Sequence, residues 1–283
     1  MMELWYSLVS FLPFEWAEPG SMLFMKNALL GILVLCPLLG LLSCHIVTGK
    51  MSFFSDALGH SAFTGIAVGA ICGAAFPMAV AVGLSVVFAL LFTYVRRKST
   101  LSGDTVIGVF SSTAVAFGIF VATLGGGSFT KFNSYLIGDI LSVTPMEIGL
   151  LALVLLAVAL LWYFASNRLF LSVLHPNLAD SRGVRVGLIQ GLFTVVIAVV
   201  VTMALSWVGL LVINSLLVLP AAAARNLAKN LRQYHLLSVL GALICGILGL
   251  MTSYYWGCSA GAAISLLLAV YFFVGFARRR RGA

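Results

Sequence analysis

The amino-acid sequence predicts an all-α membrane protein, a polytopic helix bundle with about nine spans and eight as the alternative count. Of its 283 residues, 62% are hydrophobic and only 8% are charged, and the mean hydropathy is +1.14. Soluble domains carry about a quarter charged residues, so this chain lacks the polar surface that a water-soluble globule needs. Its apolar runs are long and continuous, whereas the strands of an outer-membrane barrel alternate between apolar and polar residues. These observations exclude a soluble enzyme and disfavour a barrel.

Nine segments are candidate membrane spans, which need about 20 mostly apolar residues each. The clearest is 148–165, whose only polar side chains are one Trp and one Tyr, types that favour the membrane interface. The weakest is 54–75, which contains Asp56 and His60 together with several Gly and Ser residues. In chain order, the predicted spans are 25–46, 54–75, 77–95, 105–124, 146–166, 186–205, 208–224, 236–253 and 258–277.

The basic residues fall in alternate connections between these spans, which predicts the orientation of the chain. Fourteen of the 16 Lys and Arg residues lie at Lys50, 96–98, 168–185, 225–232 and 278–281, all on one side of a nine-span bundle. The positive-inside rule makes that side the cytoplasm. The N-terminus is then outside and the C-terminus is inside.

This topology divides the chain into three regions. Residues 1–21 form an extracytoplasmic N-terminal segment, 22–277 the transmembrane domain, and 278–283 a basic cytoplasmic tail. Within the transmembrane domain, the outer connection 125–145 contains an apolar stretch too short to span, which is expected to re-enter the membrane or lie at its surface. The inner connection 167–185 is polar and contains Pro and Gly, which suits a short helix on the cytoplasmic face.

The sequence carries no sign of a disulfide framework or of an ATP site. The five cysteines are scattered without a CxxC pair, so we expect them to act as small hydrophobic residues. A P-loop requires GxxxxGK(S/T), but the one Gly-Lys pair, Gly49-Lys50, has Cys44 and Met51 at the positions of the first Gly and the Ser/Thr. No catalytic or cofactor motif is visible, so neither an enzymatic activity nor a permanently bound cofactor is expected.

Asp56 is the acidic residue placed well within a predicted span. A carboxylate in the membrane is costly, and such residues are rare and usually functional. His60 lies four residues later on the same helical face, and Thr64 continues the stripe. The adjacent stripe, from Ala57 to Gly73, consists of small residues at a spacing of four, which lets helices approach closely. The helix is therefore expected to be buried in the bundle and to present Asp56 and His60 to an interior path near the middle of the bilayer.

Three roles for Asp56 and His60 remain open at this stage. A carboxylate and an imidazole suit a borderline divalent cation such as Zn²⁺, Mn²⁺ or Fe²⁺. Two ligands are incomplete, and the others must come from another helix, a second copy or water. A structural pairing of the two side chains and a proton relay are the alternatives.

Other polar residues are weaker candidates. Asp104 precedes an apolar run and is expected to be a helix N-cap. Asp139, in the outer apolar stretch, is either a metal ligand on the outer side or a helix cap. Asn214 and Pro220, in the span 208–224, mark either a broken helix or a tolerated kink.

Five segments in a constant order resemble the membrane permease subunits of the ABC-type manganese/zinc/iron uptake family. The first is 50–69, KMSFFSDALGHSAFTGIAVG, with its Asp-x-x-x-His helix start and its Gly-Ile-Ala run. The others are 104–108 (DTVIG), 135–145, 177–184 with its Asn-Leu-Ala and Gly-Val elements, and 208–225, which ends in LPAAAAR. The resemblance covers about residues 22–275.

The resemblance implies a homodimer of cobalamin-importer-like fold in the bacterial cytoplasmic (inner) membrane, which imports Zn²⁺, Mn²⁺ or Fe²⁺ by alternating access. It implies a separate ABC ATPase on the cytoplasmic face, which uses the ATP, and an extracytoplasmic metal-binding protein on the outer face. The chain contacts membrane lipid, and no nucleic acid is expected. Asp56 and His60 line the metal path, with Thr64 and Asp139 as weaker metal candidates. A stand-alone proton-coupled metal carrier, or an ABC permease for a metal chelate, is the alternative function.

The resemblance also assigns the inner connection 168–185 to coupling with the ATPase. The family usually has an acidic residue where this chain has Asn177, so Asp180 or the nearby arginines are the substitutes for docking through a charge. The residues implied in coupling are His175, Pro176, Asn177, Leu178, Ala179 and Gly183.

Overall fold

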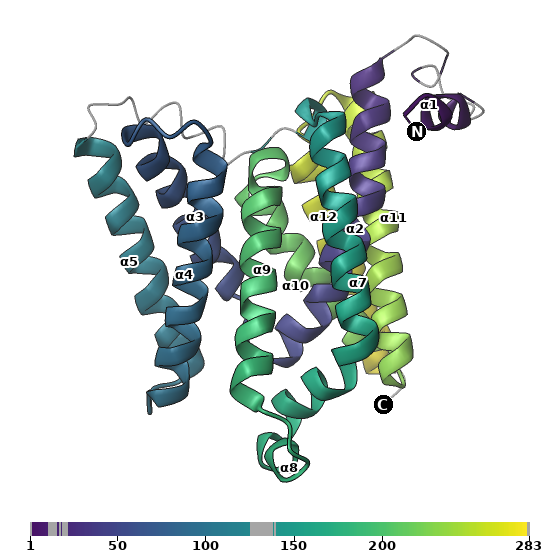
Figure 1. Cartoon of the computed structure of the whole chain (residues 1–283). Helices are drawn as coiled ribbons and strands as arrows, with labels where there is room; N and C mark the ends of the chain where they lie inside the picture. The colour runs from purple at the N-terminus through teal and green to yellow at the C-terminus, as the bar shows by residue number, and fades with distance from the viewer. Residues whose placement is uncertain are drawn as a thin grey trace.

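The structure, a computed structural model, describes residues 2–10, 16, 18, 22–124, 138 and 140–281. Within these residues every long element is an α-helix and no strand is present, which confirms the predicted fold class. The elements, labelled as in Figure 1, are α1 (Met2–Val9), α2 (Leu23–Thr48), α3 (Phe54–Ile71), α4 (Pro77–Lys98), α5 (Gly103–Leu124), the 3₁₀ turn η2 (Ile140–Ser142), α7 (Pro145–Leu174), α8 (Pro176–Ser181), α9 (Val186–Val208), α10 (Leu210–Leu227), α11 (Leu231–Trp256) and α12 (Ala260–Arg281).

Nine of the described helices, all except the short α1 and α8, form one bundle (Figure 1). Eight of these nine are long and apolar enough to cross a membrane. The exception is α3, the helix that carries Asp56 and His60, which nevertheless packs against both α4 and α5. The predicted number of spans is nine if α3 is included and eight if it is not. The polar residues of α3 lower its hydropathy below that of the other eight helices.

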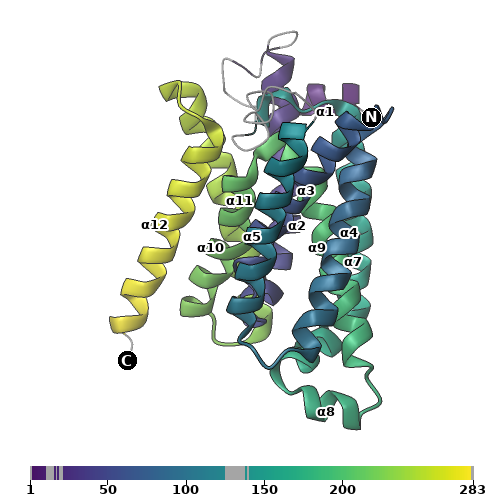
Figure 2. The same cartoon turned by 90° about the vertical axis from the view of Figure 1, so that its left-hand side faces the viewer.

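The bundle consists of two groups of helices joined by α9. In the larger group, α2 packs against α7, α10 and α11, and α12 covers α10 and α11. In the smaller group, α3 lies against α4 and α5, and α9 connects the groups by packing against α4 and α3 on one side and α7 and α10 on the other. α5 occupies the edge of the bundle and is the helix that comes forward in Figure 2. Its contacts are mostly with α3.

The small residues predicted along α3 bring this helix into backbone contact with α4. A side chain at Gly65 would collide with the backbone of Ala81, and one at Gly69 would make an unusually tight contact with Pro77. This close approach explains how a helix with two ionisable residues stays packed in the bundle, because van der Waals contact replaces hydrophobic burial as the source of attraction in a membrane.

Gly65→Val is expected to separate α3 from α4 and to lower the free energy of unfolding by about 1–3 kcal/mol, the usual cost of overpacking. Gly83→Val is the matched control, because a Cβ at Gly83 of α4 meets no atom within 4 Å. Thermal unfolding of both variants in detergent checks this. Equal stability of the two variants would contradict the close packing of α3 on α4.

The turn between α9 and α10 is held by two glycines. Gly209 joins the two helices with a φ of 77°, and Gly138, with a φ of 68°, lies against the backbone of Val208 and Gly209 so closely that no side chain fits between them. This contact fixes the described end of the outer connection to the start of α10. The remainder of the predicted outer stretch, 125–137 and Asp139, lies outside the described residues.

The basic connections gather at one end of the bundle. The Arg96 guanidinium donates a hydrogen bond of 3.0 Å to the Gly49 carbonyl, which joins the ends of α4 and α2. Thr48, Leu174 and Arg225 line one hollow, so α2, α7 and α10 end side by side. Figure 1 shows α8 and the C-terminus at this end and α1 at the opposite end. The arrangement agrees with the alternate placement of basic residues; its orientation in a membrane remains a prediction.

The prediction that Asp104 is an N-cap is wrong by two positions. The helix α5 begins at Gly103, and the Ser102 hydroxyl accepts a hydrogen bond of 3.3 Å from the Thr105 amide. An N-cap side chain accepts from an amide two or three residues later, which Ser102 does. Asp104 lies in the first turn instead, where its negative charge favours the helix N-terminus.

Candidate functional site

Asp56 and His60 lie together on α3, as their spacing predicts. Asp56 is in the first turn, and His60 follows one turn later with its Nε2 3.6 Å from the Asp56 Oδ2. The His60 side chain is 26% exposed and that of Asp56 is 37% exposed. The pair is therefore held inside the bundle but remains accessible from one side of the chain.

Two residues from other helices complete the surroundings of Asp56. The Asn214 side-chain amide of α10 donates a hydrogen bond of 3.0 Å to Asp56 Oδ1. The Ser111 hydroxyl of α5 donates one of 3.4 Å to Asp56 Oδ2. Three helices therefore meet at one carboxylate, and the two donors hold it in place.

Sequence reasoning missed both of these partners. The sequence pattern predicts a broken or kinked helix at Asn214, and it does not single out Ser111. The available signal was an amide side chain in the apolar run of α10, since a polar residue there must find a partner. The partner, Asp56, is 158 residues away in the sequence, so only the packing of α3 against α10 identifies it.

Asn214 also contributes an oxygen that no donor occupies. Its Oδ1 is buried and has no hydrogen-bond partner within the described residues. Buried acceptors in proteins are nearly always paired, so an unpaired one calls for an explanation. Because Nδ2 must face the carboxylate as a donor, Oδ1 is left as a free oxygen acceptor beside Asp56.

The position of Asp56 favours its negative charge. The N-terminal turn of an α-helix carries a partial positive charge and exposes unpaired amides, and a carboxylate there is stabilised. His60 is the one cationic partner of Asp56 among the ion pairs of the described residues, and a His is charged only when protonated. The carboxylate therefore presents a negative charge without a permanent positive partner.

Thr64 lies apart from the pair, although the sequence places it on the same stripe. It is 1% exposed, and its hydroxyl lies 2.9 Å from the His60 carbonyl and 3.0 Å from the Ala114 carbonyl. It also packs on Gly118 of α5, where no side chain fits. These contacts place Thr64 in the α3–α5 interface. Asp139, the other weaker metal candidate, lies outside the described residues.

One chain supplies an incomplete ligand set. In the part of the chain that the structure describes, no three His, Cys, Asp or Glu side chains lie close enough together to hold a metal ion. Zinc sites usually have four ligands. A metal ion bound here would take two ligands from Asp56 and His60, with Asn214 Oδ1 as a third candidate, and would need the rest from water or a second copy of the chain.

The six residues implied in coupling lie next to one another at the basic end of the bundle. Pro176, Asn177, Leu178 and Ala179 belong to α8, which lies below the bundle between α7 and α9 (Figure 1). Ala179 is buried and anchors the helix, whereas His175, Asn177 and Leu178 are exposed. Gly183, with a φ of 73°, forms the turn that follows α8. The inner connection is thus a short surface helix, as predicted, although α7 extends further, to Leu174.

Among the described residues, no cysteine belongs to a group of side chains that could hold a metal ion. All five are free: Cys36, Cys44 and Cys245 are buried in the bundle, as expected of small hydrophobic residues, whereas Cys72 and Cys258 are exposed near helix ends. The candidate site therefore remains the pair on α3 with its partners from α5 and α10.

Comparison with known proteins identifies relatives along nearly the whole chain. The sequence profile of the ABC 3 transport family matches residues 21–279. The manganese import system permease protein ScaB of Streptococcus gordonii is 31% identical over 257 residues, which cover 89% of this chain and 90% of that protein. The high-affinity zinc uptake system membrane protein ZnuB of Haemophilus influenzae is 27% identical over 255 residues, which cover 90% and 97%. The solved structure of PsaBC from Streptococcus pneumoniae in complex with Fab is similar with a TM-score of 0.77 and 27% identity, and the match covers 98% of this chain and 95% of that chain.

Proposed function

Since this chain belongs to the ABC 3 transport family, we propose that it is the permease subunit of an ATP-driven importer that carries a divalent transition-metal ion into the cell by alternating access. Zinc or manganese is the favoured cargo, with iron(II) next. The manganese and zinc systems named among its relatives support this choice. The observation that carries the proposal is the Asp56–His60 pair on α3, with Asp56 held by Asn214 and Ser111 from two other helices of an apolar bundle.

In this function Asp56 and His60 replace part of the hydration shell of the ion. A carboxylate and a neutral imidazole are ligands that Zn²⁺, Mn²⁺ and Fe²⁺ accept. Ligands must be deprotonated to bind a metal, so uptake is expected to fall as the pH becomes acidic. The structural alternative is weaker, because an ion pair as accessible as this one contributes only about 0–1 kcal/mol to stability. That gain is small against the cost of placing a carboxylate in a membrane.

A second copy of the chain would complete the ligand set. The helix α5 packs on α3 with one face, and its opposite face leaves Val109, Phe117 and Phe120 about half exposed. This unpartnered face lies beside the helix that bears the metal pair. Two copies that meet along α5 would bring two Asp56–His60 pairs to one path, which supports a homodimer.

We further propose the orientation and partners that transport requires. The basic end lies in the cytoplasm, with the C-terminus inside and the N-terminus outside, in accordance with the positive-inside rule. An ABC ATPase docks on α8 and supplies the ATP hydrolysis, and a metal-binding protein delivers the ion at the outer end. The exposure of Asp180 on α8 supports this residue as the charge that replaces an acidic side chain at Asn177.

Leu178→Ser is expected to reduce capture of the ATPase subunit at least about tenfold, because Leu178 is an apolar side chain, 44% exposed, on the surface helix proposed to dock. Phe276→Ser is the matched control: Phe276 is 40% exposed near the same end of the bundle but lies on α12. Co-purification of the tagged permease with its ATPase measures capture. Equal capture of the ATPase by the two variants would show that α8 is not part of the docking surface.

Asn214→Ala is expected to lower metal uptake roughly tenfold, because residues that orient a metal ligand usually affect affinity or activity by 10- to 100-fold. The neighbouring Ser215→Ala is the control, since the Ser215 hydroxyl bonds the Leu211 carbonyl of its own helix and no other described residue. Uptake of radioactive zinc and manganese by the reconstituted importer tests this, and the function itself. Metal uptake that needs no ATP would contradict the proposed importer.

A further inference from the structure

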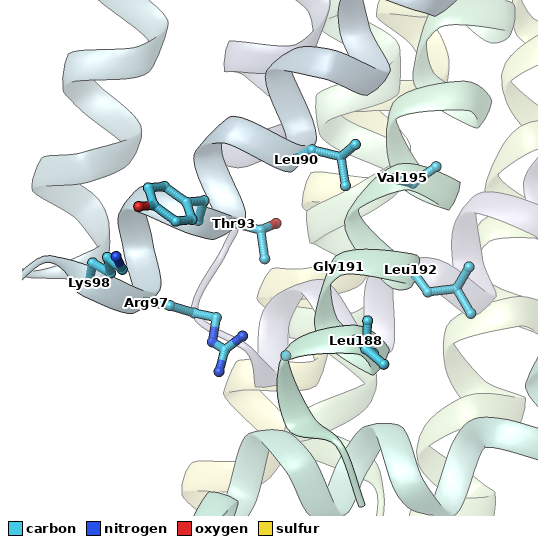
Figure 3. A pocket seen from close by; sticks show the side chains of 10 residues that line it. Leu90, Thr93, Arg97, Lys98, Leu188, Gly191, Leu192 and Val195 are labelled. Carbon is cyan, nitrogen blue, oxygen red and sulfur yellow. The ribbon is translucent and has the colours of Figure 1, made fainter.

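A groove of about 630 Å³ lies between α4 and α9 near the basic end of the bundle (Figure 3). Its walls are mostly apolar, and its mouth is formed by Arg97 and Lys98 of α4. The lining residues are Leu90, Thr93, Tyr94, Arg97 and Lys98 from α4, and Gly187, Leu188, Gly191, Leu192 and Val195 from α9. The volume is in the range of sites that bind small molecules.

Two glycines on α9 create the groove. A side chain at Gly191 would meet no atom within 4 Å, so this position opens the wall of the groove. One turn earlier, Gly187 leaves room for the Arg97 guanidinium, which lies directly against its backbone. Figure 3 shows Arg97 extending from α4 toward the first turn of α9. The groove thus has an apolar interior, and the positively charged Arg97 guanidinium lies at its opening.

The two cations at the mouth have no acidic partner. Arg97 makes no hydrogen bond or ion pair with any described residue, whereas its neighbour Arg96 is bonded to the Gly49 carbonyl. The Lys98 ammonium lies 4.8 Å from the centre of the Tyr94 ring, which leaves its charge uncompensated. No Asp or Glu lines the groove. Asp104 lines the adjacent cavity, which Arg97 also borders.

The apolar part of the groove continues away from these charges along the membrane-facing surface. Leu90, Leu188 and Leu192 are each at least half exposed. Seven residues separate Leu90 from Arg97, a distance of about 10 Å along the helix. Positive groups at one end, with Leu188 beside them and the accessible Leu90 and Leu192 farther along, match a ligand that has an anionic head and a hydrocarbon tail. An apolar helix from a second copy would instead leave two cations buried without a partner, which is costly.

We propose that this groove binds an anionic phospholipid of the cytoplasmic leaflet, with the phosphate between Arg97 and Lys98 and an acyl chain against Leu90, Leu188 and Leu192. Basic pockets between membrane helices on the cytoplasmic side are suited to acidic lipid headgroups. The proposal rests on the proposed orientation of the basic end, but not on the metal pair. The lipid would occupy the junction between the helix group that contains α3 and the rest of the bundle.

Association of spin-labelled phosphatidylglycerol with the full chain, reconstituted in phosphatidylcholine vesicles, tests the proposal. The double variant Arg97→Gln, Lys98→Gln is expected to bind the labelled lipid about thirtyfold more weakly, from roughly 1 kcal/mol per basic residue near the membrane surface. Arg278→Gln, which removes an exposed charge on α12 outside the groove, is expected to leave binding unchanged. A loss of about fivefold in Arg278→Gln, the same loss per charge removed, would indicate diffuse attraction to surface charge and overturn the site.

A second pair of variants tests the apolar part and guards against misfolding. Gly191→Leu fills the groove without altering its charge and is expected to weaken binding at least tenfold, whereas Gly83→Leu, at an equally open position on α4, is not. Unchanged binding by Gly191→Leu would overturn the placement of the acyl chain. Displacement of the lipid by inorganic phosphate alone would assign the cations to a free anion instead. Metal uptake is not measured here, so a failure of the lipid site is distinct from a failure of the transport function.

Discussion

Asp56→Asn is expected to reduce ATP-driven uptake of zinc and manganese by roughly a hundredfold or more, because it removes the one charged ligand of the pair while preserving its shape. In the unsubstituted protein, Asn214 donates a hydrogen bond of 3.0 Å to Asp56 Oδ1. The amide of the variant still offers an oxygen to this donor. Packing of α3 against α5 and α10 should therefore survive. What is lost is the negative charge that offsets the desolvation of a divalent cation.

Glu147→Gln is the matched control for Asp56→Asn. Glu147 forms a capping box with Thr144 at the start of α7, and Gln serves equally well at that position of a capping box. Glu147→Gln also replaces a carboxylate by an amide, but outside α3, so the uptake rate should stay within about twofold of the wild-type rate. Initial rates in proteoliposomes that contain the complete importer provide the measurement. Wild-type rates in Asp56→Asn would show that this carboxylate does not hold the transported ion.

His60→Ala is expected to impair zinc uptake more than manganese uptake, by roughly a hundredfold against roughly tenfold. Imidazole is a preferred ligand of zinc, whereas manganese is well served by carboxylate, carbonyl and water oxygens. Asp56 and the free Asn214 Oδ1 would remain as oxygen ligands for manganese. The variant therefore tests a role in binding as well as in transport.

The ratio of the two losses distinguishes the roles of His60. A purely structural His60 would lower both rates equally and would lower the thermal unfolding temperature with them. Unchanged rates for both metals would remove His60 from the path. Parallel uptake assays with radioactive zinc and manganese, together with unfolding of each variant in detergent, provide both readouts.

The membrane helices could be predicted well because their signal is local. Length, hydropathy and the alternation of basic connections are properties of short segments, and eight of the described helices qualify as spans by length and composition alone. The helix α3 is the informative exception. Its small residues do not raise its hydropathy, yet Gly65 lets it approach Ala81 of α4. Packing rather than hydropathy stabilises this helix. Its end at Ile71, four residues earlier than predicted, therefore has no clear signal in the hydropathy of the sequence.

Two of the four residues of the candidate site, Asp56 and His60, could be predicted from the sequence. The i, i+4 spacing of Asp56 and His60 places both on one face of a helix, which any helical segment would do. The contributions of Ser111 and Asn214 depend on how α3 packs against α5 and α10, and no local pattern specifies that packing. The same limit explains Thr64, which shares the stripe with the pair but lies in the contact with α5.

Titration of the purified chain with Mn²⁺ in lipid nanodiscs, followed by electron paramagnetic resonance, tests the metal pair most directly. Manganese is suited to carboxylate and other oxygen ligands rather than to thiolates, so the exposed Cys72 and Cys258 should not obscure the result. We predict one bound ion per two chains, lost in Asp56→Asn and weakened in His60→Ala. Binding that persists when Asp56→Asn and His60→Ala are combined in one chain would contradict a metal path through Asp56 and His60.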